Sequence, residues 1–247
     1  MDDATIRSDY ASLAEAAETV GSPQIRNVGT LGGNLCQRPR CWYFRNEHYE
    51  CLKKGGARCF AYDDNAENRY NAILGGGPAY IVHPSNCATS LVALDATVAI
   101  SGPNGDRTIS IDDFFVLPRV RLLKENVLDA GEIVTRVTIP TPGAKTRSAY
   151  VDFAEKNAFD WALSGAAVSA TFQGDRVSSA RILLHAVAPV PWRALKAERI
   201  VAGTTLDEAT RHEAAEAALE GAEPLSQNGY KIPLTKAMVR EALSRIA

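Results

Sequence analysis

The apolar residues of this chain follow a helical spacing in several stretches. In the first, Leu13, Ala16 and Val20 recur every three or four positions, Ser12 begins a capping-box pattern, and Gly21 stops it. The same spacing, bounded by polar and turn-forming residues, returns further along the chain. We expect helices at about 12–21, 86–94, 193–201, 206–219 and 235–246.

Other stretches alternate between apolar and polar residues, which is the period of a strand. Asn104-Gly105 is a strong two-residue hairpin signal between alternating runs at 97–101 and 107–111. In 131–140, Ile133, Val137 and Ile139 are spaced for one face. Further strands are predicted at 72–74, 79–82, 166–172 and 177–188. Antiparallel strands mixed with helices predict an α+β fold.

One short segment separates two halves of the pattern. Thr141-Pro142-Gly143-Ala144-Lys145 is rich in turn formers and lies between two periodic regions. We therefore expect one domain at 1–141 and a smaller α+β domain at 145–247.

A glycine-rich segment, Gly29-Thr30-Leu31-Gly32-Gly33-Asn34, follows the first predicted helix. Glycine adopts positive φ readily and lets the backbone pass close to a ligand. Successive N–H groups in such a turn can surround the oxygens of a pyrophosphate, and Thr30 and Asn34 would add side-chain donors. The segment therefore predicts either an anion-binding turn or an ordinary structural turn.

Four of the five cysteines come directly after these glycines. Cys36, Cys41, Cys51 and Cys59 have the spacing C-x4-C-x9-C-x7-C, and Cys87 is separate. The spacing lacks the close C-x2-C pairs typical of structural zinc, and an odd number of cysteines in a chain of this length does not indicate disulfides. Four thiolates in a loop rich in glycine, lysine and arginine fit a [4Fe–4S] cluster, whose ligand spacing varies. We expect such a loop at about 35–71, with Cys87 as a buried apolar residue.

Composition and charge exclude some partners. The 247 residues are 46% hydrophobic and 23% charged, as in ordinary globular proteins, with a formal net charge of −2. That charge gives no electrostatic reason to expect nucleic acid or a membrane as a partner. No apolar run approaches the about 20 residues of a membrane helix, and we expect no leader peptide. The expected location is the cytoplasm or, alternatively, the periplasm after export within a folded complex.

Four runs carry a resemblance to a known family: SPQIRNVGTLGGNLCQRPRCWYFR, CLKKGG, ENRYNAILGGG and HPSNCATSLVALDATVAI. They resemble the FAD-binding medium subunit of the xanthine dehydrogenase or molybdenum hydroxylase family. The most similar branch has an extra [4Fe–4S] loop in its flavin subunit, as in aldehyde oxidoreductases and 4-hydroxybenzoyl-CoA reductase. The similarity extends from about Ser8 to Ile246. It implies the second part of a PCMH-type FAD-binding domain, followed by a C-terminal domain similar to that of CO dehydrogenase flavoproteins.

The resemblance also implies which residues bind cofactors, and it assigns no catalytic residue to this chain. Where the family usually has a Ser-Asp pair at a helix start, this chain has Ser85-Asn86, so a neutral amide replaces a carboxylate. The cluster is expected on Cys36, Cys41, Cys51 and Cys59, with Cys87 as the alternate for Cys36. The residues expected to contact FAD are Gly29, Thr30, Leu31, Gly32, Gly33, Asn34, Ser85, Asn86 and Ile133.

The implied function is electron transfer within an oxidoreductase. Electrons would come from a large molybdopterin subunit and a small [2Fe–2S] subunit, after oxidation of an aldehyde or aromatic substrate, and would leave FAD for an external acceptor. Two alternatives stay open: a non-catalytic zinc-binding scaffold without flavin, and a stand-alone flavin dehydrogenase. Family members share the FAD pyrophosphate with an earlier glycine loop of the GGT type. We therefore expect that a longer gene product or a separate chain completes the FAD site, or that the flavin has been lost.

Overall fold

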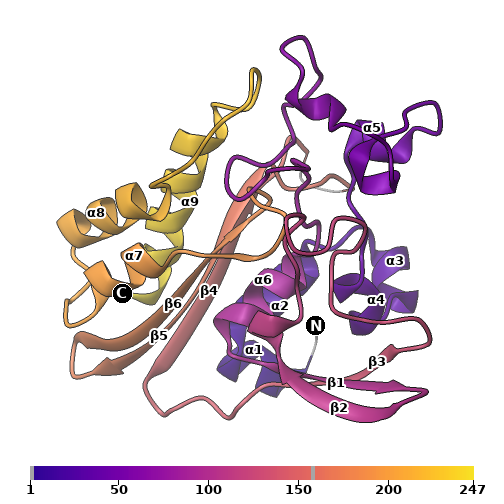
Figure 1. Ribbon diagram of the computed structural model, residues 1–247. Coiled ribbons are helices and arrows are strands. Elements are labelled where there is room, and N and C mark those ends of the chain that lie inside the picture. The colour runs from indigo at the N-terminus through magenta and orange to yellow at the C-terminus, as the bar shows by residue number, and fades with distance from the viewer. Residues whose placement is uncertain (1–2, 157–158) are drawn as a thin grey trace.

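The computed structural model describes residues 3–156 and 159–247, which form two antiparallel sheets, helices and a long cysteine-containing loop (Figure 1). The helices are α1 (Ala4–Asp9), α2 (Ala11–Glu18), α3 (Pro23–Val28), α4 (Leu31–Leu35), α5 (Trp42–Arg45), α6 (Asn86–Ala93), α7 (Leu195–Val201), α8 (Glu208–Ala218) and α9 (Lys231–Ile246). The strands are β1 (Thr97–Gly102), β2 (Gly105–Ser110), β3 (Ile133–Thr138), β4 (Thr146–Phe153), β5 (Ser164–Gln173), β6 (Arg176–His185) and β7 (Trp192–Arg193). This mixture of helices and antiparallel strands confirms the predicted α+β class.

The four-stranded sheet, of order β4-β5-β6-β7, is covered by helices on both faces. Successive strand residues point to opposite faces. Ala166 and Val168 of β5 accordingly belong to the core shared with α7, α8 and α9, whereas Ala167 packs on the opposite side with α2 and α6. Burial on both faces explains why the sequence of β5 is almost continuously apolar.

The three-stranded sheet has the order β2-β1-β3, and β1 and β2 are joined at the predicted hairpin. The pairing of β1 with β3 shifts register between Ala99 and Ile100, because Thr135 is an extra residue in β3. Val134 and Val137 therefore pack against the core, while Ile133 points outward with 64% of its surface exposed. The predicted apolar face that included Ile133 is wrong for that residue, since the bulge breaks the alternation.

The first 35 residues depart from the expected single helix and glycine turn. Between residues 3 and 35 the structure has four short helices, and α2 begins without a side-chain cap, so the capping box predicted at Ser12 is wrong. Segments 72–74 and 79–82 are apolar but not strands. Ile73 and Leu74 instead both donate backbone hydrogen bonds to Val187 O, at 2.9 and 3.1 Å, which ties this segment to the C-terminal half.

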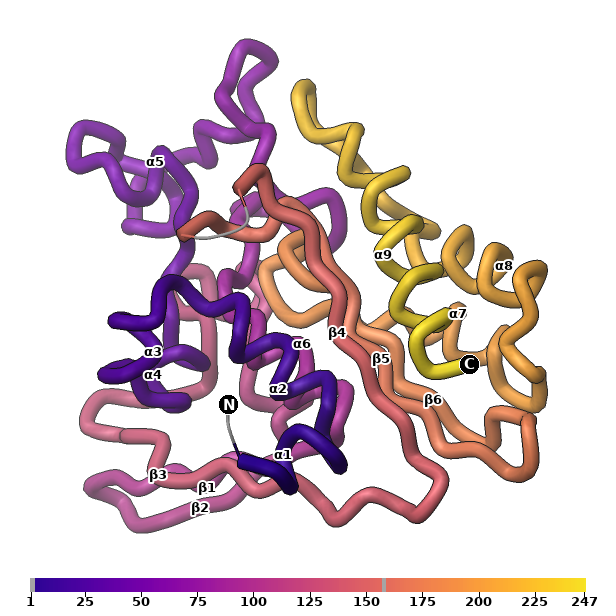
Figure 2. The backbone as a smooth tube through the Cα atoms, turned by 180° about the vertical axis from the view of Figure 1, so that it is seen from behind, coloured from indigo at the N-terminus to yellow at the C-terminus, as the bar shows by residue number. Residues whose placement is uncertain are grey.

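The cysteine-containing loop rises from the body of the molecule and returns at residues 68–72 (Figure 2). At its return, Asn228 donates to Asn71 O at 3.0 Å and Lys231 donates to Tyr70 O at 3.0 Å. The C-terminal segment therefore anchors the base of the loop.

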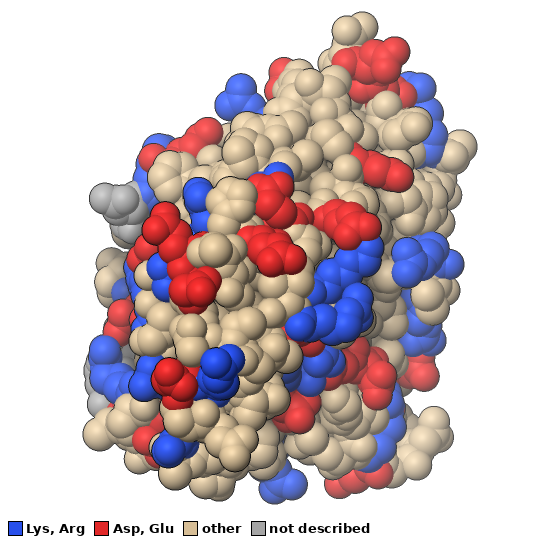
Figure 3. Space-filling view, turned by 90° about the vertical axis from the view of Figure 1, so that its left-hand side faces the viewer, with Lys and Arg blue, Asp and Glu red and all other residues tan. Residues whose placement is uncertain are grey.

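On the face formed by the C-terminal helices, acidic and basic side chains lie side by side (Figure 3). None of the helices in the described parts of the chain combines the length and apolar character needed to cross a bilayer.

Candidate cofactor cleft

A cleft of about 860 Å³ opens between α2, α3, α4, the start of α6 and residues 159–161, which lie between β4 and β5. Its volume lies in the range of small-molecule and cofactor sites. Both expected domains contribute to it, since the β4–β5 loop belongs to the C-terminal half. The lining includes Thr19, Arg26, Thr30, Asn34, Asn86 and Trp161.

The glycine segment forms the start of α4 and not a turn. Thr30 is the N-cap, and its side chain accepts from Gly33 N at 3.1 Å while its carbonyl accepts from Asn34 N at 3.0 Å. The N–H groups of Leu31 and Gly32 have no protein partner within the described residues, so they are the backbone donors still available.

None of these glycines has a positive φ, so that part of the sequence prediction is wrong. Close packing gives the actual reason for glycine at two positions. A Cβ on Gly29 would lie 2.9 Å from Ile25 O, and one on Gly33 would lie 3.1 Å from the Thr30 hydroxyl that caps the helix.

Asn34 presents hydrogen-bond donors to the cleft. Its side-chain oxygen accepts from the Ser85 hydroxyl, which in turn accepts from Ala88 N at 3.0 Å as the N-cap of α6. Because this oxygen is engaged, the amide N–H groups of Asn34 are left for a ligand.

Two arginines give the cleft positive charge. Arg26 donates to Val20 O at 3.0 Å, and its Nε is buried without a partner within the described residues. The guanidinium carbon of Arg40 lies 4.5 Å from the ring centroid of Trp161. Burial lowers the pKa of Arg40, and the nearby charge of Arg45 lowers it further. Both arginines line the cleft, where their positive charge would favour an anionic ligand.

Six of the nine residues predicted to contact FAD line this cleft: Gly29, Thr30, Leu31, Gly33, Asn34 and Asn86. The other three do not. Gly32 packs toward Val134 of β3, Ser85 is buried and acts through Asn34, and Ile133 is turned outward by the bulge. The sequence analysis did not predict Thr19, which follows α2, or Arg26, which lies in α3.

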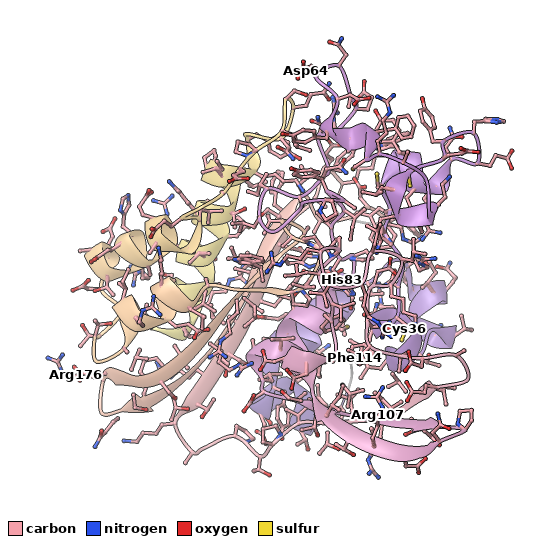
Figure 4. All side chains as sticks on the ribbon, in the orientation of Figure 1. Cys36, Asp64, His83, Arg107, Phe114 and Arg176 are labelled. Atoms are coloured by element: carbon pink, nitrogen blue, oxygen red, sulfur yellow. The ribbon has the colours of Figure 1, made fainter. Side chains whose placement is uncertain are left out.

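The four predicted cluster ligands do not lie together. Cys36 follows α4 and is half-buried against the core of the N-terminal half, where burial raises its pKa. Cys36 packs against the core that contains Phe114, and Figure 4 shows it far from Asp64 in the cysteine-containing loop. The alternate ligand, Cys87, is buried in the same core, and burial raises its pKa to about 11.

Cys41, Cys51 and Cys59 are near one another in the loop. The pKa of Cys59 is raised first by burial and then by the neighbouring thiols of Cys41 and Cys51. Across the described residues, however, no three His, Cys, Asp or Glu side chains are arranged to hold a metal ion. The predicted four-thiolate set therefore does not fit a cluster in this arrangement.

The loop is packed by contacts of its own. Tyr43, Tyr49 and Phe60 form an aromatic cluster with ring centroids 5.0 to 5.9 Å apart. The buried ammonium of Lys53 lies 2.9 Å from a carboxylate oxygen of Glu125.

Backbone and amide donors, two guanidinium groups and an aromatic wall suit a cofactor that joins phosphates to a flat ring system. The residues present therefore fit a dinucleotide such as FAD.

Comparison with known families defines the chain further. The model of the FAD-binding domain in molybdopterin dehydrogenase matches residues 1–142, and that of the CO dehydrogenase flavoprotein C-terminal domain matches residues 149–246. The chain belongs to the FAD-binding flavoprotein subunits of the molybdenum hydroxylase family, which confirms the predicted resemblance.

Individual relatives agree with this assignment. The chain is 33% identical to the aldehyde oxidoreductase FAD-binding subunit of Escherichia coli (strain K12), over 97% of this chain and 72% of that protein. It is 28% identical to the carbon monoxide dehydrogenase medium chain of Hydrogenophaga pseudoflava, over 94% of this chain but 65% of that protein. Carbon monoxide dehydrogenase from Hydrogenophaga pseudoflava also has a solved structure that superposes with a TM-score of 0.70 at 27% identity, covering 98% of this chain and 69% of that one.

Proposed function

We propose that this chain is the FAD-binding, electron-transfer subunit of a molybdenum-dependent hydroxylase that oxidises an aldehyde or aromatic substrate. The observation that carries the proposal is the cleft, in which helix-start amides, Asn34 and Arg26 offer donors suited to phosphates. The similarity to an aldehyde oxidoreductase FAD-binding subunit supports the choice of substrate class.

Bound FAD supplies reversible electron acceptance, and the residues of this chain hold it in place. The free N–H group of Leu31, which lines the cleft, would bind a phosphate oxygen, and the guanidinium group of Arg26 would offset the phosphate charge. Trp161 and Arg40, which stack on each other in the lining of the cleft, would contact the flat ring system of the cofactor.

The proposed partners are a large molybdopterin subunit and a small [2Fe–2S] subunit, with an external acceptor that takes electrons from FAD. Relatives described as a medium chain and as an FAD-binding subunit support a multi-subunit assembly. The [4Fe–4S] cluster expected on Cys36, Cys41, Cys51 and Cys59 is not carried into the proposal, because no three of these side chains within the described residues are arranged to hold a metal ion. Because the four-thiolate set does not fit, no electron step is assigned to the loop.

Cofactor analysis of the purified protein, with any subunits that co-purify, tests the function. We expect visible flavin absorption and FAD released by heat, and Arg26→Gln should lower the FAD content. Arg176→Gln is the matched control, since Arg176 lies at the far end of the β5–β6 hairpin (Figure 4). Colourless protein that contains zinc would replace this proposal with the scaffold alternative. Dye reduction by substrate without partner subunits would favour a stand-alone dehydrogenase.

A further inference from the structure

The amide of Asn86 is held in one orientation by two neighbours. Its Nδ2 donates to the Thr19 hydroxyl oxygen at 2.6 Å and to the Asp152 carboxylate at 3.1 Å, so both of its N–H groups are used. Thr19 has a single hydroxyl proton, which Ala16 O at 2.9 Å and the Asp152 carboxylate can both accept, so toward the Asn86 amide Thr19 acts as an acceptor. The side-chain oxygen of Asn86 has no protein partner within the described residues, and Asn86 lines the cleft.

Asp152 comes from the other half of the chain. It lies on β4 of the C-terminal sheet, and it also accepts from the buried Tyr150 hydroxyl at 3.0 Å. Burial raises the pKa of Asp152, and the hydrogen bonds from Tyr150, Thr19 and Asn86 oppose that shift. These contacts fix the carboxylate against the amide.

The two asparagines of the cleft therefore offer opposite chemistry. Asn34 has its oxygen engaged and presents N–H donors, whereas Asn86 has its N–H groups engaged and presents only an acceptor. Donors suit phosphate oxygens, which carry no proton, while an acceptor suits a hydroxyl group. A ligand that carries both phosphates and hydroxyls, as FAD does, matches this pair.

We propose that Asp152 is a positioning residue that locks the Asn86 amide with its oxygen toward the cleft, where that oxygen accepts a hydrogen bond from a hydroxyl group of FAD. The inference rests on the proposed FAD binding. Asp152, on β4, thereby makes the neutral amide of Asn86 a pure acceptor toward the cleft. Position 86 then has the hydrogen-bonding character of a carboxylate without carrying a charge.

The test is FAD titration of the deflavinated full-length protein, followed by flavin fluorescence, with four variants. Asp152→Ala frees the amide to present its N–H groups, and we expect about tenfold weaker binding. Asn86→Asp alone places two carboxylates together and should also weaken binding. The double variant Asp152→Ala/Asn86→Asp has an acceptor in every orientation, and its affinity should return to within about threefold of wild type.

Tyr150→Phe is the control for general loss of packing, because it removes one hydrogen bond to Asp152 and leaves the contact with Asn86 intact. Its FAD affinity should equal that of wild type. Unchanged binding in Asp152→Ala, or a double variant as weak as Asp152→Ala, would overturn the inference while FAD binding by the wild type still stands. Failure of the wild type to bind FAD would instead overturn the proposed function, and this inference with it.

Discussion

Lys231→Met is expected to change how the stability of this protein depends on pH. Lys231 is 1% exposed, and its ammonium donates to two backbone carbonyls, Tyr70 O at 3.0 Å and Ala186 O at 2.7 Å. No carboxylate pairs with it within residues 3–156 and 159–247. Burial lowers its pKa from 10.5 to about 7.

The sign follows from proton binding in the two states. Between about pH 7 and the ordinary lysine pKa of about 10.4, the unfolded chain binds more protons than the folded one, so the free energy of unfolding rises with pH. Below about pH 7 both states are protonated, and the cost of burying the charge remains in full. From about pH 7 to about pH 9.5 the pKa shift corresponds to about 3 kcal/mol.

Urea unfolding of the wild type and Lys231→Met at both pH values measures this contribution. The difference in free energy of unfolding should move by about 3 kcal/mol in favour of the wild type as the pH rises. Groups present in both proteins cancel, and the nearby His185, whose pKa burial lowers to about 3, titrates well below this window. Lys236→Met, on the same helix, controls for loss of a lysine as such. A difference that is the same at both pH values would refute the reasoning.

Three further perturbations follow from the structure. Thr30→Ala removes the cap on Gly33 N, which is worth about 1 kcal/mol. FAD binding should then weaken about fivefold in a fluorescence titration, whereas Thr30→Ser should bind as wild type does. Equal affinities of the two variants would contradict the role of the cap. Glu125→Gln leaves the buried Lys53 without its carboxylate and should lower the free energy of unfolding, measured in urea, by about 3 kcal/mol. Asp129→Asn breaks an exposed ion pair and is the control, for which we expect a smaller loss of stability. Equal losses in the two variants would count against a buried pair. Cys36→Ala should leave the iron content of the purified protein unchanged, because this thiol packs in the core, and loss of iron would identify it as a ligand.

Much of the fold was predictable because its signals are local. The helix at 86–94 and the hairpin at Asn104-Gly105 were found nearly in place, as α6 and as the β1–β2 connection. Helices α3 and α4 were missed, since six- and five-residue helices carry little periodicity and two glycines in α4 argue against a helix. Ile133 was misplaced because a bulge leaves no signal in the alternation until the partner strand is known.

The site divides in the same way. The glycine segment and Ser85-Asn86 were identifiable from sequence, and most of these residues line the cleft. The contact between Asn86 and Asp152 was not, because 66 residues separate the two and only the packing of β4 brings them together. The cysteines also depend on tertiary packing. Their spacing in the sequence does not indicate that Cys36 packs against the core, away from the other three.

Strand β4 is the outer edge of its sheet, and the way this edge is covered explains why the C-terminal half is needed for a cleft that lies mostly in the N-terminal half. An uncovered edge exposes unpaired N–H and C=O groups. Here α2 lies along it (Figures 1 and 2). Tyr150 N donates to the Glu15 carboxylate at 2.6 Å, and Ser148 Oγ accepts from Ser12 N at 3.2 Å. These bonds fix α2, and with it Thr19 at the helix end, which orients Asn86. The wall of the cleft is therefore positioned by the sheet edge that it covers, so loosening β4 should weaken cofactor binding even where no contacting residue is altered.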